Sequence, residues 1–170
     1  MNGLFREFDP FPSRINWALN YSLTTRVLIF AFSETHLSRT DSLPPEKLHP
    51  LYKFEPGNDR TNRRGGTGLL IHQYVKYKSL KPVLDPKVES TCISFDMYSQ
   101  SVIFATVYLP QHDSSEITRF MTLLDKILDL TPDLLIVTGD FNSRHEAWGD
   151  SVTNSRGRSL LQGLDRKSVV

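Results

Sequence analysis

A chain of 170 residues, 39% of them hydrophobic, is long enough to form one domain with a hydrophobic core. Its net charge is only +1, so any binding to nucleic acid must depend on local clusters of basic residues. The single cysteine, Cys92, excludes an internal disulfide and a zinc site built from several cysteines. The longest apolar run, residues 27–32, is far too short to cross a bilayer, and residues 1–12 lack the pattern of a secretory signal. We therefore expect an intracellular protein, nuclear or cytoplasmic, that does not bind membranes.

Segments of strand and helix character alternate along the chain. Five have the composition of strands: residues 26–32, 68–72, 89–97, 102–108 and 134–138. The first and the last are almost continuously apolar, which predicts buried strands, and the polar break at 98–101 predicts a hairpin. From residue 114 to residue 128, apolar residues recur at helical spacing behind serines that suit a helix cap. This strand, helix, strand order favours an α/β sandwich over an all-β fold, with Cys92 as a small core residue.

Polar side chains follow three of these strands. Glu34 follows the first, Tyr108 ends the fourth, and Asp140 and Asn142 follow the fifth. In open α/β sheets, ligands bind beyond the carboxyl ends of the strands, and oxygen-bearing side chains suit Mg²⁺ or Mn²⁺. If the chain stays extended, Asp140 and Asn142 point the same way, while Phe141 points into the core. We predict that Glu34 and Asp140 share the metal ion, that Asn142 donates to a phosphate oxygen, and that the Tyr108 hydroxyl lies near the developing charge.

Each of these residues also has a structural interpretation. A carboxylate after a strand often caps a turn, and a tyrosine before Leu-Pro is often a half-buried packing residue. His145 could line the site, although nothing in the sequence marks it as a general base. Several of the arginines could grip a nucleic-acid backbone, but such residues more often lie in a solvated loop. They are Arg60, Arg63, Arg64, Arg144, Arg156 and Arg158.

Taken together, these motifs resemble those of the endonuclease/exonuclease/phosphatase superfamily. The residues that carry the resemblance are 33–37, 65–71, 107–110 and 139–142, in this order. The continuation His145-x-x-Trp148-Gly149, followed by Asn154-x-Arg156-Gly157-Arg158, resembles the apurinic-type endonuclease domain of non-LTR (LINE-type, jockey-like) retrotransposons. The resemblance covers most of the chain, from about residue 33 to residue 164.

This resemblance implies a four-layered α/β sandwich that forms a single domain over residues 1–170. It also implies a monomeric, Mg²⁺-dependent nuclease that nicks target DNA and belongs to a polyprotein with a reverse-transcriptase domain. Glu34 matches the metal-binding glutamate of the family and Tyr108 its active-site tyrosine. Asp140 matches the aspartate that acts on the nucleophile or leaving group, and Asn142 the asparagine that orients the substrate. Arg63, Arg64, Arg144, His145 and Arg156 are the candidates for contacts with the substrate.

The sequence departs from the family pattern at both ends. Residues 1–4 resemble the tail of a family motif whose strand and first asparagine are absent, and the Asp-His pair that supplies a metal ligand and the general base occurs nowhere. We therefore expect a sandwich incomplete at its N- and C-terminal strands, with weak or no nuclease activity. Two alternatives remain open: a non-catalytic nucleic-acid-binding remnant that uses the arginines, and another phosphoesterase of the same superfamily.

Overall fold

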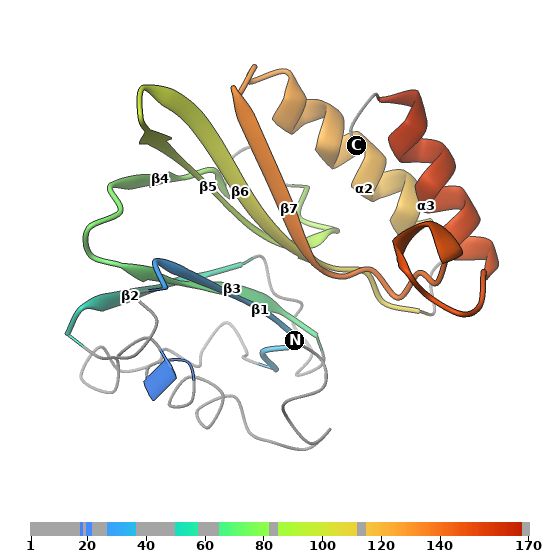
Figure 1. Ribbon diagram of the computed structural model, residues 1–170, viewed down its shortest axis with the longest axis horizontal. Coiled ribbons are helices and arrows are strands. Elements are labelled where there is room, and N and C mark those ends of the chain that lie inside the picture. Colours follow the sequence, from blue (N-terminus) through green and yellow to red (C-terminus); the bar gives the residue numbers. More distant parts are fainter. Residues whose placement is uncertain are drawn as a thin grey trace.

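Two β-sheets pack against each other, and two helices cover the outer face of the larger sheet (Figure 1). The computed structural model describes residues 18, 20–21, 27–36, 50–57, 65–81, 85–111 and 115–167. The α/β sandwich predicted from the sequence is confirmed. Residues 1–4 and the cluster Arg60, Arg63 and Arg64 lie outside the described residues.

The smaller sheet is antiparallel and has the order β1-β3-β2. Its strands are β1 (Ile29–Ser33), β3 (Thr67–His72) and β2 (Tyr52–Pro56). The first two match predicted strands, whereas β2 was not predicted. The expectation that the first strand is buried on both faces is wrong, because only Phe30 of β1 is fully buried. Phe30 packs on the outer face of this sheet with Ala18, Tyr52 and Leu70.

The larger sheet has the order β4-β5-β6-β7. Its strands are β4 (Tyr77–Ser79), β5 (Glu89–Met97), β6 (Gln100–Tyr108) and β7 (Leu134–Asp140). The predicted hairpin is confirmed: β5 and β6 pair antiparallel through a turn in which Tyr98 and Ser99 have φ of +53° and +66°. Left-handed turn residues match the twist of the two strands. The helix α2 (Glu116–Leu128) then crosses over, so that β7 pairs parallel to β6.

Two predicted details of this crossover are wrong. Ser115 stands at the start of α2, but its side chain makes no capping hydrogen bond, since its own backbone is already helical; Ser114 lies outside the described residues. The strand β7 is not buried: Leu134 is 39% exposed and Ile136 38%, because β7 stands last in its sheet among the described strands. A second helix, α3 (Ser155–Arg166), follows β7 and packs beside α2.

Alternate residues of the larger sheet enter two different cores. Cys92, Ala105 and Val107 face α2, and Cys92 is only 1% exposed, which confirms it as a core residue. Ile93 and Phe104 face the smaller sheet. The face of each strand residue is therefore set by the alternation of the strand. None of the helices within the described ranges is long and apolar enough to span a bilayer.

Candidate active site

Three polar residues stand side by side at one end of the larger sheet. Glu89 of β5 is paired with Tyr108 of β6, and Tyr108 is paired with Asp140 of β7. Paired residues on neighbouring strands present their side chains on the same face. That face is the one toward the smaller sheet, since the Thr91 hydroxyl on the same side of β5 lies 2.9 Å from the Thr67 hydroxyl of β3.

The hydroxyl of Tyr108 joins this row to Glu34, which directly follows β1. Burial raises the pKa of Tyr108 above its usual range, and a hydrogen bond with the Glu34 carboxylate raises it further. The negative charges of Glu34, Asp140 and Glu89 add to this effect, in that order. The structure thus brings together Glu34, Tyr108 and Asp140, and it keeps the Tyr108 phenol protonated at neutral pH.

Glu89 belongs to this group, although it was not predicted from the sequence. Its side chain is only 2% exposed, and its Oε2 accepts a hydrogen bond of 2.6 Å from the backbone N–H of Gly66. A Cβ at Gly65, where φ is +86°, would overlap this carboxylate and lie 3.0 Å from Cε1 of Tyr108. The two glycines therefore let the turn before β3 approach Glu89 and Tyr108 closely. In the sequence, the signal available was a glutamate at the first position of a predicted strand.

The same glycine turn holds the segment that carries Glu34. The N–H of Thr35 donates to the Gly66 carbonyl at 3.2 Å, and the N–H of His36 donates to the Gly65 carbonyl at 2.8 Å. Glu34 and His36 have φ of +56° and +53°, a conformation that costs free energy in residues with side chains. Backbone strain of this kind is frequent at functional sites, where the surrounding structure holds it in place.

The turn after β7 is built by Gly139, Asp140 and Asn142. Gly139 has φ of +138°, and a Cβ there would overlap the carbonyl oxygen of Val107. The strand ends at Asp140, and the Asp140 Oδ1 accepts a 2.9 Å hydrogen bond from the N–H of Asn142, whose φ is +48°. The prediction that the chain stays extended from Asp140 to Asn142 is therefore wrong, because the aspartate forms an Asx turn. Phe141 does point into the core, where its ring lies 5.5 Å from that of Phe120.

The amide of Asn142 is held at both ends. Its Oδ1 accepts a 2.8 Å hydrogen bond from Nε2 of Gln111, and its Nδ2 donates to the Leu109 carbonyl at 3.1 Å. An amide nitrogen carries two hydrogens, so one N–H can still serve a ligand. Gln111 was not predicted as a site residue, although it follows the Tyr108-Leu109-Pro110 motif directly.

Two arginines predicted to contact the substrate lie among the described residues, and both contact other groups of this chain. Arg144 forms a bidentate pair with Asp150, with N–O distances of 2.9 to 3.1 Å. This pair raises the pKa of Arg144 and lowers that of Asp150. The Nη2 of Arg156 lies 3.4 Å from the Leu109 carbonyl oxygen and 3.5 Å from that of Phe141. A substrate contact by either arginine remains a prediction.

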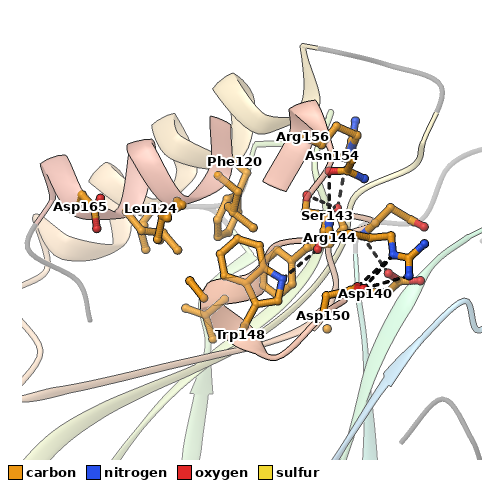
Figure 2. A pocket seen from close by; sticks show the side chains of 18 of the residues that line it. Phe120, Leu124, Asp140, Ser143, Arg144, Trp148, Asp150, Asn154, Arg156 and Asp165 are labelled. Carbon is orange, nitrogen blue, oxygen red and sulfur yellow. Dashed lines mark hydrogen bonds and ion pairs between the residues drawn. The ribbon is translucent and has the colours of Figure 1, made fainter. Parts of the chain in front are cut away.

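His145 lies in the loop after β7 and packs against Trp148, with 5.2 Å between the ring centres and 46° between the ring planes. Its Nδ1 accepts a 3.0 Å hydrogen bond from the N–H of Ala147 and so caps the short helix η3 (Glu146–Trp148). Trp148 in turn donates from Nε1 to the Ser143 carbonyl at 3.1 Å (Figure 2). These contacts fold the loop onto itself.

A cavity of about 1200 Å³ reaches Asp140 and Asn142 (Figure 2). Its apolar wall includes Phe120 and Leu124 of α2, and Trp148 lies across from them. Of the catalytic candidates, Asp140 and Asn142 therefore line this cavity.

The donor set fits a divalent cation of the Mg²⁺ type. The Tyr108 hydroxyl is hydrogen-bonded to Glu34 and also senses the charge of Asp140, so both carboxylates lie near the same hydroxyl. Mg²⁺ usually takes one or two carboxylates from the protein and completes its octahedron with water and phosphate oxygens. Over the part of the chain that the structure describes, no three His, Cys, Asp or Glu side chains form a metal site by themselves.

Comparison with known sequences finds transposon proteins. Residues 102–170 match a family described as endonuclease–reverse transcriptase. The probable RNA-directed DNA polymerase from transposon X-element of Drosophila melanogaster is 27% identical over 137 residues. The RNA-directed DNA polymerase from mobile element jockey of Drosophila funebris is 21% identical over 134 residues. These matches cover 78% and 79% of this chain but only 14% of each relative.

Comparison with solved structures finds the same sandwich. The endonuclease domain of TRAS1, a telomere-specific non-LTR retrotransposon, superposes with a TM-score of 0.71 at 10% identity, over 89% of this chain and 64% of that domain. An AP endonuclease from Archaeoglobus fulgidus gives 0.55 at 16% identity, over 91% and 66% of the two chains. TDP2 of D. rerio, complexed with a single-strand DNA product, gives 0.57 at 18% identity, over 82% and 57%. At these identities, the likeness establishes the fold.

Proposed function

Because this chain is similar to transposon endonuclease–reverse transcriptase proteins and has the fold of a retrotransposon endonuclease domain, we propose that it belongs to the endonuclease/exonuclease/phosphatase superfamily and is a metal-dependent phosphodiesterase domain acting on DNA. The residues that we assign to its site are Glu34, Tyr108, Asp140 and Asn142. The observation that carries the proposal is the position of Tyr108 between two carboxylates: Asp140 is its partner on the neighbouring strand, and Glu34, which follows a strand of the other sheet, is hydrogen-bonded to its hydroxyl.

Glu34 and Asp140 would hold Mg²⁺, and Mn²⁺ suits the same oxygen donors. When bound, the metal ion stabilises negative charge on the phosphate oxygens. The Tyr108 phenol is protonated at neutral pH, and its one hydrogen, which is donated to Glu34 in this structure, could turn to an oxygen on which charge develops. The remaining N–H of Asn142 is placed to orient a phosphate oxygen, since Gln111 and Leu109 fix the plane of the amide.

We propose that the activity of this chain alone is weak or absent. No Asp-His pair occurs among the 170 residues. His145 is a poor substitute: its Nδ1 accepts a hydrogen bond from Ala147, so the neutral ring carries its hydrogen on Nε2. Neither nitrogen is then ready to take a proton from water. Loss of one member of a catalytic set costs many orders of magnitude when its members act as a unit.

The partners follow from the same similarity. The relatives are RNA-directed DNA polymerases of transposons, so we propose that the parent protein carries a reverse-transcriptase domain and that the substrate is DNA. The alternative of a non-catalytic nucleic-acid-binding remnant gains little from Arg144 and Arg156, since Arg144 is paired with Asp150 and Arg156 points at backbone carbonyls.

A plasmid-nicking assay tests the proposed function. Supercoiled plasmid is incubated with the chain in Mg²⁺, Mn²⁺ or chelator, beside Asp140→Ala and the control Lys126→Ala on the exposed face of α2. We expect slow, metal-dependent nicking, or none, in the parent and in Lys126→Ala. Where the parent nicks measurably, Asp140→Ala should nick less, and equal measurable nicking in Asp140→Ala would contradict the assignment. Fast nicking abolished by Asp140→Ala would support the site and overturn the expectation of weak activity.

A further inference from the structure

The first turn of α3 lies against the loop that follows Asp140, and one side chain joins the two. The N–H of Asn154 donates to the Arg144 carbonyl at 2.9 Å. The Oδ1 of Asn154 accepts hydrogen bonds from the N–H of Arg144 at 3.2 Å and from the N–H of Gly157 at 2.7 Å. Asn154 is thus the N-cap of α3 and, at the same time, pairs with the backbone of Arg144 (Figure 2).

Gly157 lets the helix approach this loop. A Cβ at Gly157 would overlap the carbonyl oxygen of Arg144 and lie 2.6 Å from its carbonyl carbon. These are backbone atoms, which cannot turn aside as the end of a side chain can. A residue larger than glycine would therefore push α3 and the loop apart.

Arg156 extends the connection to the candidate site. Its Nη2 lies 3.4 Å from the Leu109 carbonyl oxygen and 3.5 Å from that of Phe141. The same Leu109 carbonyl accepts the hydrogen bond from Asn142 Nδ2, and the Leu109 N–H donates to the Asp140 carbonyl at 2.9 Å. One carbonyl group thus connects the first turn of α3 to Asn142.

We propose that residues 154–157, the α3 clamp, position the amide of Asn142. The clamp joins the segment after β7, which carries Asn142, to the segment after β6, whose Leu109 and Gln111 hold both ends of the Asn142 amide. Asn154, Arg156 and Gly157 are positioning residues that act through Leu109 and Arg144. The effect of the clamp on cleavage rests on the proposed function, whereas its effect on the orientation of Asn142 does not.

The test compares two glycine-to-alanine changes in the same helix. Gly157→Ala places a methyl group against the Arg144 backbone, whereas Gly163→Ala places it 2.7 Å from the Sδ and Cε atoms of the flexible Met121 side chain. The readout is the side-chain amide resonance of Asn142 in ¹⁵N-labelled protein, assigned by its loss in Asn142→Asp. We expect Gly157→Ala to shift or broaden this resonance and Gly163→Ala to leave it in place.

A second variant covers the case in which Gly157→Ala does not fold. Arg156→Lys keeps the helix and the charge but removes the planar guanidinium that reaches two carbonyls. We expect the Asn142 resonance to shift in Arg156→Lys as well. An unmoved Asn142 resonance in the folded variant, or an equal shift in Gly163→Ala, would overturn the clamp.

Nicking assays on the same proteins separate the two proposals. If the parent chain nicks DNA, we expect a fall in kcat in Gly157→Ala and Arg156→Lys, with KM less affected. If the parent does not nick but the resonance still shifts, the clamp holds, and the proposed function is then tested by metal binding at Glu34 and Asp140: a Tm that does not respond to Mg²⁺ or Mn²⁺ would count against it. Metal-dependent nicking with an unmoved resonance would support the proposed function and overturn the clamp.

Discussion

Gly139 has a φ of +138°, and a side chain there would overlap the Val107 carbonyl, so both torsion and space require glycine. The next residue, Asp140, pairs with Tyr108 and also accepts the hydrogen bond from the Asn142 N–H that closes the turn. The spacing of Gly, Asp and Asn in this motif therefore follows from a strand end and an Asx turn.

Gly139→Ala is expected to destabilise the fold by about 3 kcal/mol or more, because it combines backbone strain with a clash against backbone. Gly149→Ala is the matched control: Gly149 has φ of +84°, but a Cβ at this residue would meet no described atom within 4 Å. This second change should cost only about 1 kcal/mol. Urea unfolding measures both. Equal losses of unfolding free energy in the two variants would show that the clash with the Val107 carbonyl does not contribute to the need for glycine at residue 139.

Cys92 should be inert in the folded chain. Burial raises the pKa of its thiol from 9.0 to about 12, so the thiolate is scarce at pH 8. In the unfolded chain the thiol ionises at the lower pKa, so its contribution to stability is complete below about pH 9 and is lost as the pH rises from there toward 12. We expect iodoacetamide to label Cys92 only after unfolding, and stability to fall less between pH 8 and pH 10 in Cys92→Ala. Rapid labelling of the native chain at pH 8 would contradict this.

At the level of elements, the strands and the helix with a strong hydrophobic periodicity could be predicted from the sequence. The alternation of β5 and β6 and the helical spacing of α2 mark elements with one face in the core at Cys92, Ala105 and Leu123. In α3, by contrast, only Gly157 and Leu160 are buried, so its apolar face is too narrow to signal a helix. The short strand β2 carries Lys53 and Glu55, and its pairing with β3 outweighs its weak strand propensity.

The candidate site also has a part that could be predicted from the sequence and a part that could not. Glu34, Tyr108 and Asp140 follow from the rule that ligands bind at the carboxyl ends of strands. Glu89 stands at the amino end of β5, and it reaches Tyr108 only because β5 runs antiparallel to β6. The contacts of Asn142 depend on its own left-handed backbone and on Gln111. Neither feature produces a periodic pattern in the sequence.

The β5–β6 hairpin offers a prediction at this scale. Ser99 has φ of +66°, a conformation that glycine adopts without the steric cost of a side chain. Ser99→Gly should raise the free energy of unfolding by up to about 1 kcal/mol. Ser99→Val, with a β-branched side chain, should lower it. Thermal unfolding of the two variants checks the sign, and a stabilising Ser99→Val would contradict the turn geometry.

At the level of the whole molecule, the site depends on both sheets. Glu34 and the turn at Gly65–Gly66 come from the smaller sheet, and Glu89, Tyr108 and Asp140 come from the larger one. Leu69 and Ile71 pack against Ile93 and Phe104 between the sheets and hold the two halves together. Packing between the sheets therefore sets the distance between the two carboxylates that we assign to the metal ion.

The most direct test of this site measures thermal unfolding in Mg²⁺ and Mn²⁺ for the parent, Glu34→Gln and Asp140→Asn. A cation that binds only the folded chain adds about 2.7 kcal/mol of stability at a concentration 100 times its Kd. We predict a metal-dependent rise in Tm in the parent that is lost in both variants, since each removes one of the two carboxylates near the Tyr108 hydroxyl. The variants should be at least as stable as the parent in chelator, because like charges around Tyr108 are removed. Equal metal-dependent rises in all three proteins would contradict a shared metal site at Glu34 and Asp140.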